Sequence, residues 1–189
     1  MTSRKTFLKQ SLLSSTLLLP SALSNQLQRL DPTEKKPAYG PVILSTWNHG
    51  QKANAEAWRT LENSGTILDA VEQGVKVTEA DPNSRTVGLN GYPDREGIVT
   101  LDASIMTGDG NCGSVCFVRR IKHPITLARH VMEKTPHVML AGAGAQKFAV
   151  KQGMPLEEEE LHPESKKRYE EWLKTAEYRP EVNIENHDT

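Results

Sequence analysis

Apolar positions recur at helical spacing in two consecutive segments of the first half of the chain. In residues 55–61 they fall three apart, and the pattern stops at Gly65, a residue type that often follows the last turn of a helix. A second run over 68–78 ends before Pro82, where proline cannot continue a helix. The spacing predicts two helices, and it assigns Trp58 to the buried face of the first.

Strands are predicted by a different pattern, in which apolar and polar residues alternate or form short apolar runs. Residues 99–105 alternate with the period of a half-buried strand, and 114–118 form a second strand. A turn at Gly110 lies between them, so the two segments predict a hairpin. The short apolar run 41–46 predicts a buried strand, and the run 138–142 predicts a further strand.

Helices return in the last third of the chain. Proline at a first helical turn predicts a helix from Pro124 to Lys134, and further helices are expected over 145–153 and 163–175. The resulting order mixes a hairpin with helices on both sides of it. That order predicts an α+β layered domain rather than a doubly wound parallel sheet.

The N-terminus has the pattern of an export signal. Basic residues precede an apolar stretch of roughly 12–19, and small residues follow it at Ala22 and Ser24. We therefore expect a signal peptide over 1–24, a polar lead-in over 25–38 and the domain over 39–189. The apolar stretch is too short for a spanning helix, although an N-terminal anchor is the alternative. The start also resembles the twin-arginine export motif, with Lys5 in place of the second arginine.

Composition removes several classes of function. The formal charge is −1 and no basic stripe is present, so we expect no nucleic-acid partner. The glycine-rich segment 141–145 lacks the spacing of a phosphate-binding loop and is interpreted as close strand–helix packing. Cys112 and Cys116 are four apart in a predicted strand, which is too far for a disulfide. No second Cys/His pair has ligand spacing, so we predict no metal site.

The last three residues, His187-Asp188-Thr189, permit a specific chemistry. The hydroxyl of Thr189 lies one residue from the carbonyl carbon of Asp188 and can attack it if the backbone is held strained. Hydrolysis of the resulting ester would free the α-amino group of Thr189, which can then accept the proton of its own hydroxyl. Such tripeptides also occur by chance, and the alternative is an ordinary turn or a helix N-cap.

The chain around this tripeptide resembles the precursors of glycosylasparaginases (aspartylglucosaminidases), a family of N-terminal-nucleophile amidohydrolases. The resemblance rests on segments in family order: "PVILSTWN" (41–48), "GTILDAVEQGVKV" (65–77), "VGLNGYPDREGIVTLDASIM" (87–106), residues 119–149 and "NIENHDT" (183–189). The ending His-Asp-Thr favours glycosylasparaginases over the related plant-type asparaginases and isoaspartyl peptidases, whose cleavage usually lies at Gly-Thr.

The resemblance implies roles for particular residues. Thr189 would be the catalytic nucleophile, and Asp188 and His187 match the motif before the cleavage point. Thr86 stands where the family often has a serine near that point, and Trp47 matches a tryptophan of the substrate pocket. The ordinary alternative for Trp47 is a core aromatic.

Other polar residues are interpreted more plainly. His49 replaces a frequent phenylalanine of the family, which makes the rate of self-cleavage a question for this chain. Asp94 and Asp102 could be read as paired carboxylates, but we interpret them as turn and strand-end residues with hydrogen-bonding duties.

The fold implied by the resemblance is a four-layer αββα sandwich, of which this chain would supply the α-subunit portion, about half. We expect the partner to be a β-subunit from the same precursor, in an (αβ)2 heterotetramer. The family's oxyanion donors and substrate-binding arginine lie in the β-subunit, so the chain alone is expected to be inactive. It is also expected to expose apolar sheet surface.

The implied activity is hydrolysis of the amide that links N-acetylglucosamine to asparagine, with the protein exported to a periplasm or a lysosome. Two alternatives stay open at this point. One is an asparaginase or isoaspartyl peptidase of the same family, because specificity depends on the other half. The other is a non-catalytic secreted fragment.

Overall fold

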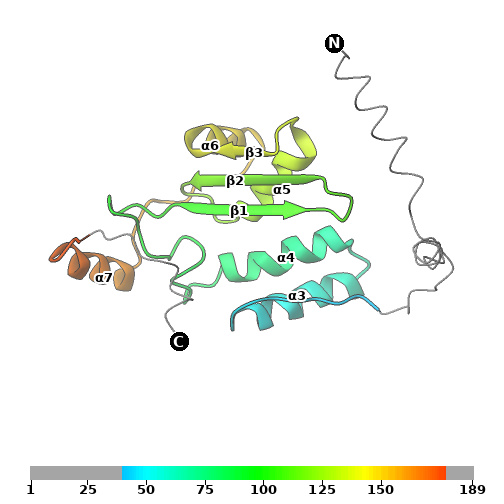
Figure 1. Ribbon diagram of the computed structural model, residues 1–189, viewed down its shortest axis with the longest axis horizontal. Coiled ribbons are helices and arrows are strands. Elements are labelled where there is room, and N and C mark those ends of the chain that lie inside the picture. The colour runs from blue at the N-terminus through cyan, green and yellow to red at the C-terminus, as the bar shows by residue number, and fades with distance from the viewer. Residues whose placement is uncertain (1–39, 178–189) are drawn as a thin grey trace, which may run out of the picture. The chain divides into compact units, whose positions relative to one another are not determined.

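The computed structural model describes residues 40–177, and the structural statements below concern these residues. They form three strands and five helices in mixed order (Figure 1). The strands are β1 (Leu101–Met106), β2 (Cys112–Val118) and β3 (Met139–Ala141). The helices are α3 (Gly50–Glu62), α4 (Ile67–Glu79), α5 (Pro124–Lys134), α6 (Gly142–Lys151) and α7 (Pro163–Leu173).

The sheet has the order β1-β2-β3 and combines two kinds of pairing. Strands β1 and β2 form the predicted antiparallel hairpin, in which Ser104 lies opposite Ser114. Strand β3 returns after α5 and pairs with β2 in parallel, with Leu140 opposite Val115. A hairpin joined to a parallel crossover makes the predicted mixture of helix and sheet, and the α+β prediction is confirmed at this level.

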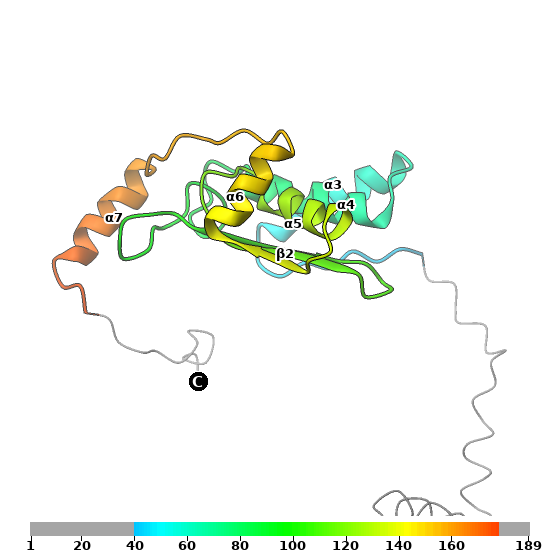
Figure 2. The ribbon, with the colours of Figure 1, turned by 90° about the horizontal axis from the view of Figure 1, so that it is seen from above.

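Helices α5 and α6 pack on one face of the sheet, and no helix among those described covers the other face (Figure 2). Helix α5 approaches β2 closely at Gly113, where an added Cβ would lie 2.2 Å from the carbonyl oxygen of Ala128. The core lies between this sheet face and the two helices. It consists of Leu101, Ile105, Val115, Val118, Ile121, Ile125, Leu127, Ala128, Val131, Met132, Ala145 and Ala149.

Helices α3 and α4 form an antiparallel pair, and α4 also contacts α5. The close approach depends on Gly74, because a Cβ there would lie 2.8 Å from the carbonyl oxygen of Ala53. Thr66 begins α4 with a capping box, in which its hydroxyl accepts from the backbone N–H of Asp69 and the Asp69 carboxylate accepts from the N–H of Thr66. This cap fixes the point at which the chain turns from α3 into α4.

Two predictions about the first third of the chain are wrong. Residues 41–46 form no strand, and Leu44 is 88% exposed, because none of the strands in the described sheet pairs with this segment. Trp58 is not a core residue: its side chain is 44% exposed on α3 and its indole N–H donates to Glu62 at 2.8 Å. The helical spacing identified α3 correctly but did not show that the face carrying Trp58 is exposed to solvent.

The glycine-rich segment 141–145 confirms the packing interpretation only in part. Ala145 is fully buried in the core. Gly142 instead has a positive φ of 49°, which favours glycine, and an added Cβ at Gly144 would meet no atom of the described chain.

Between residues 40 and 177, no helix is long and apolar enough to cross a membrane.

Candidate functional site

The predicted nucleophile Thr189 and its neighbours Asp188 and His187 lie outside the described residues, as do the predicted signal peptide 1–24 and the whole of the lead-in 25–38. The structure places the other two predicted site residues, Trp47 and Thr86. They lie on different loops, and the described part of the chain shows no hydrogen bond or ring contact between them.

Trp47 is held outside the core by a tight turn that leads into α3. Its φ is +67°, which is uncommon for a bulky residue, and its side chain is 72% exposed. The turn is closed by the N–H of Gly50, which donates to the carbonyl oxygen of Trp47 at 3.1 Å. The alternative of a core aromatic is therefore wrong, and an exposed indole is available to contact a ligand or another chain.

The turn is fixed on both sides of Trp47. The Ser45 hydroxyl bonds to the side-chain oxygen of Asn54 on α3, and Ser45 lies so close to Gly50 that an added Cβ there would clash at 2.4 Å. His49 is the half-buried residue that precedes the first residue of α3, and its side chain makes no capping hydrogen bond. The sequence therefore presents Trp47 from a rigid corner rather than from a loose tail.

Thr86 lies in the irregular segment 80–100, which connects α4 to β1, and its side chain is exposed. The backbone is held on both sides of it. The carbonyl oxygen of Arg85 accepts from the N–H of Tyr92 at 3.0 Å, and the N–H of Val87 donates to the hydroxyl of Ser84 at 3.1 Å. The Thr86 hydroxyl is thus presented at a fixed place on the surface, as a positioned polar group requires.

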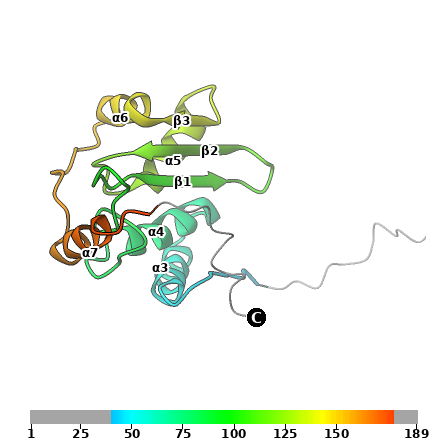
Figure 3. The ribbon, with the colours of Figure 1, turned by 60° about the vertical axis from the view of Figure 1, so that its left-hand side comes forward.

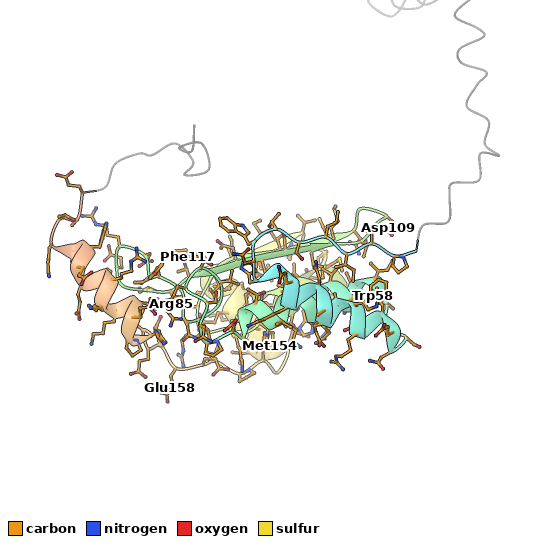
Figure 4. All side chains as sticks on the ribbon, turned by 90° about the horizontal axis from the view of Figure 1, so that it is seen from below. Trp58, Arg85, Asp109, Phe117, Met154 and Glu158 are labelled. Atoms are coloured by element: carbon orange, nitrogen blue, oxygen red, sulfur yellow. The ribbon has the colours of Figure 1, made fainter. Side chains whose placement is uncertain are left out.

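Sequence reasoning missed Arg85, the residue directly before Thr86. Only 13% of its side chain is exposed, and its guanidinium bonds to the segment that carries it and to the start of α7. No motif marked it, because an arginine in a turn is ordinary in sequence. Figure 4 shows Arg85 beside α7.

Asp94 and Asp102 have the hydrogen-bonding duties that the sequence predicted. One carboxylate oxygen of Asp94 accepts from the N–H groups of Glu96 and Ile98, each at 2.9 Å. A carboxylate oxygen of Asp102 accepts from the N–H of Phe117 at 2.7 Å, across the irregular start of the hairpin. Each carboxylate therefore accepts backbone hydrogen bonds in a turn or at a strand end, and the interpretation is confirmed.

A buried ionisable cluster joins α4 to α5 and was not predicted. Burial raises the pKa of Glu79 to about 7, against a smaller opposite effect of the Ile125 N–H that donates to it at 2.9 Å. Its other oxygen lies 3.2 Å from Nδ1 of His123. The Glu79 side chain is only 3% exposed, so substrate cannot reach it, and the cluster is structural.

Arg129 extends the same cluster along the two helices. Its guanidinium bonds to Asp69 at 2.6 Å and to Glu72 at 2.8 Å on α4, and to Glu133 at 2.7 Å on its own helix. The capping Thr66 hydroxyl and this guanidinium together lower the pKa of Asp69 to about 2. The ion pairs therefore fix α4 against α5.

Among the described residues, the cysteines form no disulfide and no side-chain cluster could bind a metal ion. Cys112 and Cys116 are free thiols, and the sulfur of Cys116 lies 3.9 Å from that of Met139. Within residues 40–177, no group of three or more histidine, cysteine, aspartate or glutamate side chains could hold a metal ion.

Residues 45–189 match the protein family described as Asparaginase. The chain is also 50% identical over 187 residues to an N(4)-(beta-N-acetylglucosaminyl)-L-asparaginase of Elizabethkingia miricola, an alignment that covers 99% of this chain and 54% of the relative. The rat protein of the same name is 41% identical over 134 residues, covering 70% of this chain and 38% of the relative.

A plant relative is more distant. The probable isoaspartyl peptidase/L-asparaginase 3 of Arabidopsis thaliana is 36% identical over 159 residues, which is 84% of this chain and 43% of the relative. The chain thus spans about half the length, or less, of these three curated relatives.

Proposed function

Because this chain belongs to the asparaginase family of N-terminal-nucleophile hydrolases, we propose that it is the nucleophile-bearing first half of a glycosylasparaginase. The observation that carries the proposal is the 50% identity to a bacterial N(4)-(beta-N-acetylglucosaminyl)-L-asparaginase along 99% of the chain. The proposed substrate is the amide that joins N-acetylglucosamine to the side chain of asparagine. The exposed Trp47 supports a binding surface on this half.

Self-cleavage would come first. The hydroxyl oxygen of Thr189 attacks the carbonyl carbon of Asp188, the peptide C–N bond breaks, and the proton of the hydroxyl passes to the departing amine. An ester then joins Asp188 to the Thr189 oxygen. Water hydrolyses this ester, which restores the hydroxyl and gives one chain ending at Asp188 and one beginning at Thr189. His187 and Asp188 would hold the turn, and Thr86 would supply a hydroxyl near the bond.

Turnover would reuse the same oxygen. The free α-amino group of Thr189 accepts the hydroxyl proton, and the oxygen attacks the side-chain amide carbon of the substrate. The glycosylamine leaves with that proton, and an aspartyl ester remains on Thr189. Water hydrolyses the ester and releases aspartate. No metal or organic cofactor enters these steps, because the nucleophile and its base belong to one residue.

The partner and the complete fold belong to the same proposal. A β-subunit that begins at Thr189 would cover the open face of the sheet and complete a four-layer αββα sandwich. Two such αβ units would form the heterotetramer. Support comes from the exposed large side chains Met106, Phe117 and Met139, which a second sheet would bury. The leader pattern of residues 1–24 supports export, to the periplasm of a bacterium or the lysosome of a eukaryote.

The rival function is that of an asparaginase or isoaspartyl peptidase, and the 36% identity to the Arabidopsis protein is the observation in its favour. Comparing kcat/KM for a glycosylated asparagine, for free asparagine and for an isoaspartyl dipeptide would separate the two. We expect a preference for the glycosylated substrate. A higher kcat/KM for the isoaspartyl dipeptide would favour the rival.

A further inference from the structure

Helix α7 is attached to the segment 80–100, the segment that carries Thr86 (Figure 3). Its polar contacts within the described chain run to residues 85–95 of that segment. The Ser165 hydroxyl donates to the carbonyl oxygen of Asn90 at 2.9 Å, the Tyr169 hydroxyl to that of Arg95 at 3.0 Å, and Arg168 to the hydroxyl of Tyr92 at 2.7 Å. Ser165 is fully buried, so this contact is a packed junction rather than a loose surface encounter.

Arg85 joins the N-terminus of α7 to the turn before Thr86. Within its own turn the guanidinium donates to the carbonyl oxygens of Pro82 and Ser84, each at 2.8 Å. Toward α7 it donates to Glu164 at 3.1 Å and lies 3.1 Å from Nε2 of His162. Arginine suits this position, because its planar fork can serve several acceptors at once.

The same residue fixes the backbone next to Thr86. Its carbonyl oxygen is held by the N–H of Tyr92, and Tyr92 is held in turn by Arg168, whose guanidinium lies 5.0 Å from the centre of the tyrosine ring. Arg85 therefore links three features: the peptide unit that precedes Thr86, the backbone of Tyr92 and the first turn of α7.

Helix α7 also determines where the proposed cleavage segment begins. It ends at Leu173, and Asp188 follows 15 residues later (188 − 173). Such a connection spans at most about 50 Å when fully extended. Fixing α7 beside the Thr86 segment therefore fixes the helix from which the connection to the proposed cleavage bond leaves.

We propose that Arg85 is a positioning residue for self-cleavage, which acts by holding α7, the helix that precedes the proposed cleavage bond, against the Thr86 segment. This inference rests on the proposed function, because it requires a cleavage between Asp188 and Thr189. Arg85 does not contact the reacting atoms in this account. Its contribution is made before maturation, so it alters the rate of processing and leaves the chemistry of the mature enzyme unchanged.

The test uses the full-length precursor and follows the fraction cleaved over time by mass spectrometry. Arg85→Met should slow processing by about tenfold or more, as small misplacements of reacting groups do. Arg85→Lys should restore part of the rate. Arg119→Met is the matched control, because Arg119 also bonds to a glutamate, Glu159 at 2.7 Å, but lies outside the junction with α7. It should process normally.

A second pair of variants keeps the test decisive if Arg85→Met does not fold. Glu164 is 60% exposed and Glu170 is exposed on the same helix, so Glu164→Ala and Glu170→Ala should both fold. Only the first should slow processing. Melting temperatures are compared in a Thr189→Ala background, where cleavage cannot intervene, and kcat and KM are measured on the processed fractions.

Slow processing with an unchanged melting temperature, normal kcat and KM once cleaved, and partial rescue by lysine would support the positioning role. Normal processing of Arg85→Met or, if that variant does not fold, of Glu164→Ala would overturn it. So would an equal effect of the control variants. A wild-type precursor that is not cleaved at Asp188-Thr189 would instead overturn the proposed function itself, which distinguishes the two failures.

Discussion

At the scale of single residues, Glu79 is a carboxyl group that is almost completely removed from water. Its side chain is 3% exposed, and burial raises its pKa to about 7. Its neighbour His123 shifts the other way, since burial and the positive charges of Lys76 and Lys122 lower the pKa of the imidazole. Glu72 also faces the pair and favours protonation of both groups. Near pH 7 this environment therefore favours the uncharged form of both residues.

This environment predicts a pH dependence of stability. Between pH 4.5 and about 7 the folded state holds a proton on Glu79 that the unfolded state has released, so the free energy of unfolding falls as the pH rises. The effect is at most about 3 kcal/mol. His123 contributes with the opposite sign, so Glu79→Gln is compared with wild type to isolate the carboxyl group.

The measurement is chemical denaturation of the full-length Thr189→Ala precursor at pH 5, 6, 7 and 8, with and without Glu79→Gln. The stability of the parent relative to the Gln variant should decline up to about pH 7 and level off by pH 8. A difference that stays constant with pH would show that Glu79 keeps an ordinary pKa when folded.

Trp47 carries the prediction about substrate at this scale. Because its indole is 72% exposed on a rigid corner, Trp47→Ala should leave folding and processing intact but raise KM for the glycosylated substrate about tenfold or more. Trp58→Ala is the matched control, since Trp58 is also exposed but lies on α3 and bonds to Glu62. Unchanged steady-state kinetics for Trp47→Ala would remove this residue from the pocket.

At the scale of elements, the closest approach in the core is that of α5 to β2. An added methyl group at Gly113 would lie 2.2 Å from Ala128 and 2.6 Å from the backbone nitrogen of Met132. Both are backbone atoms of α5, so the helix as a whole would have to move. Gly144 on α6 offers a comparison, because a Cβ there meets nothing in the described chain.

Gly113→Ala should therefore lower the free energy of unfolding by about 2–3 kcal/mol or more through overpacking. Gly144→Ala should cost little, and the better helix propensity of alanine favours it. Both are measured by denaturant unfolding of the full-length Thr189→Ala precursor. Equal stability of the two variants would mean that α5 does not sit against β2 as described.

Local sequence patterns predicted most of the helices and strands, but not which residues pack against them. The hairpin at Gly110, the helix Pro124–Lys134 and the end of α4 before Pro82 follow from spacing and turn chemistry, which are local. The failures at 41–46 and Trp58 share a cause, because both required knowledge of what covers a segment. Arg85 was missed for the same reason: its partners Glu164 and His162 are 79 and 77 residues away.

At the scale of the whole molecule, the sheet has two different faces. One carries the core under α5 and α6, and the other presents Met106 at 68% exposure, Phe117 at 58% and Met139 at 53% (Figure 4 labels Phe117). Exposed apolar side chains gathered on one sheet face are typical of an interface. The relatives are nearly twice as long as this chain, and we propose that the sequence they have beyond it covers this face.

Met106→Lys tests that cover in the full-length precursor. A lysine placed under a second sheet would be buried without a partner, so soluble yield and processing should both fall sharply. Val150→Lys is the control, because Val150 is 52% exposed on α6, on the opposite side of the sheet. It should behave like wild type. A Met106→Lys precursor with normal yield and processing would show that this face stays in water.

The central claim is that Thr189 becomes an N-terminal nucleophile. Intact-mass measurement with N-terminal sequencing of the mature full-length protein tests it most directly, beside the Thr189→Ala variant. For the wild type we expect one chain that ends at Asp188 and a second that begins with Thr189. For the variant we expect a single uncut chain. Two chains of normal size from Thr189→Ala, or an uncut wild type, would contradict it.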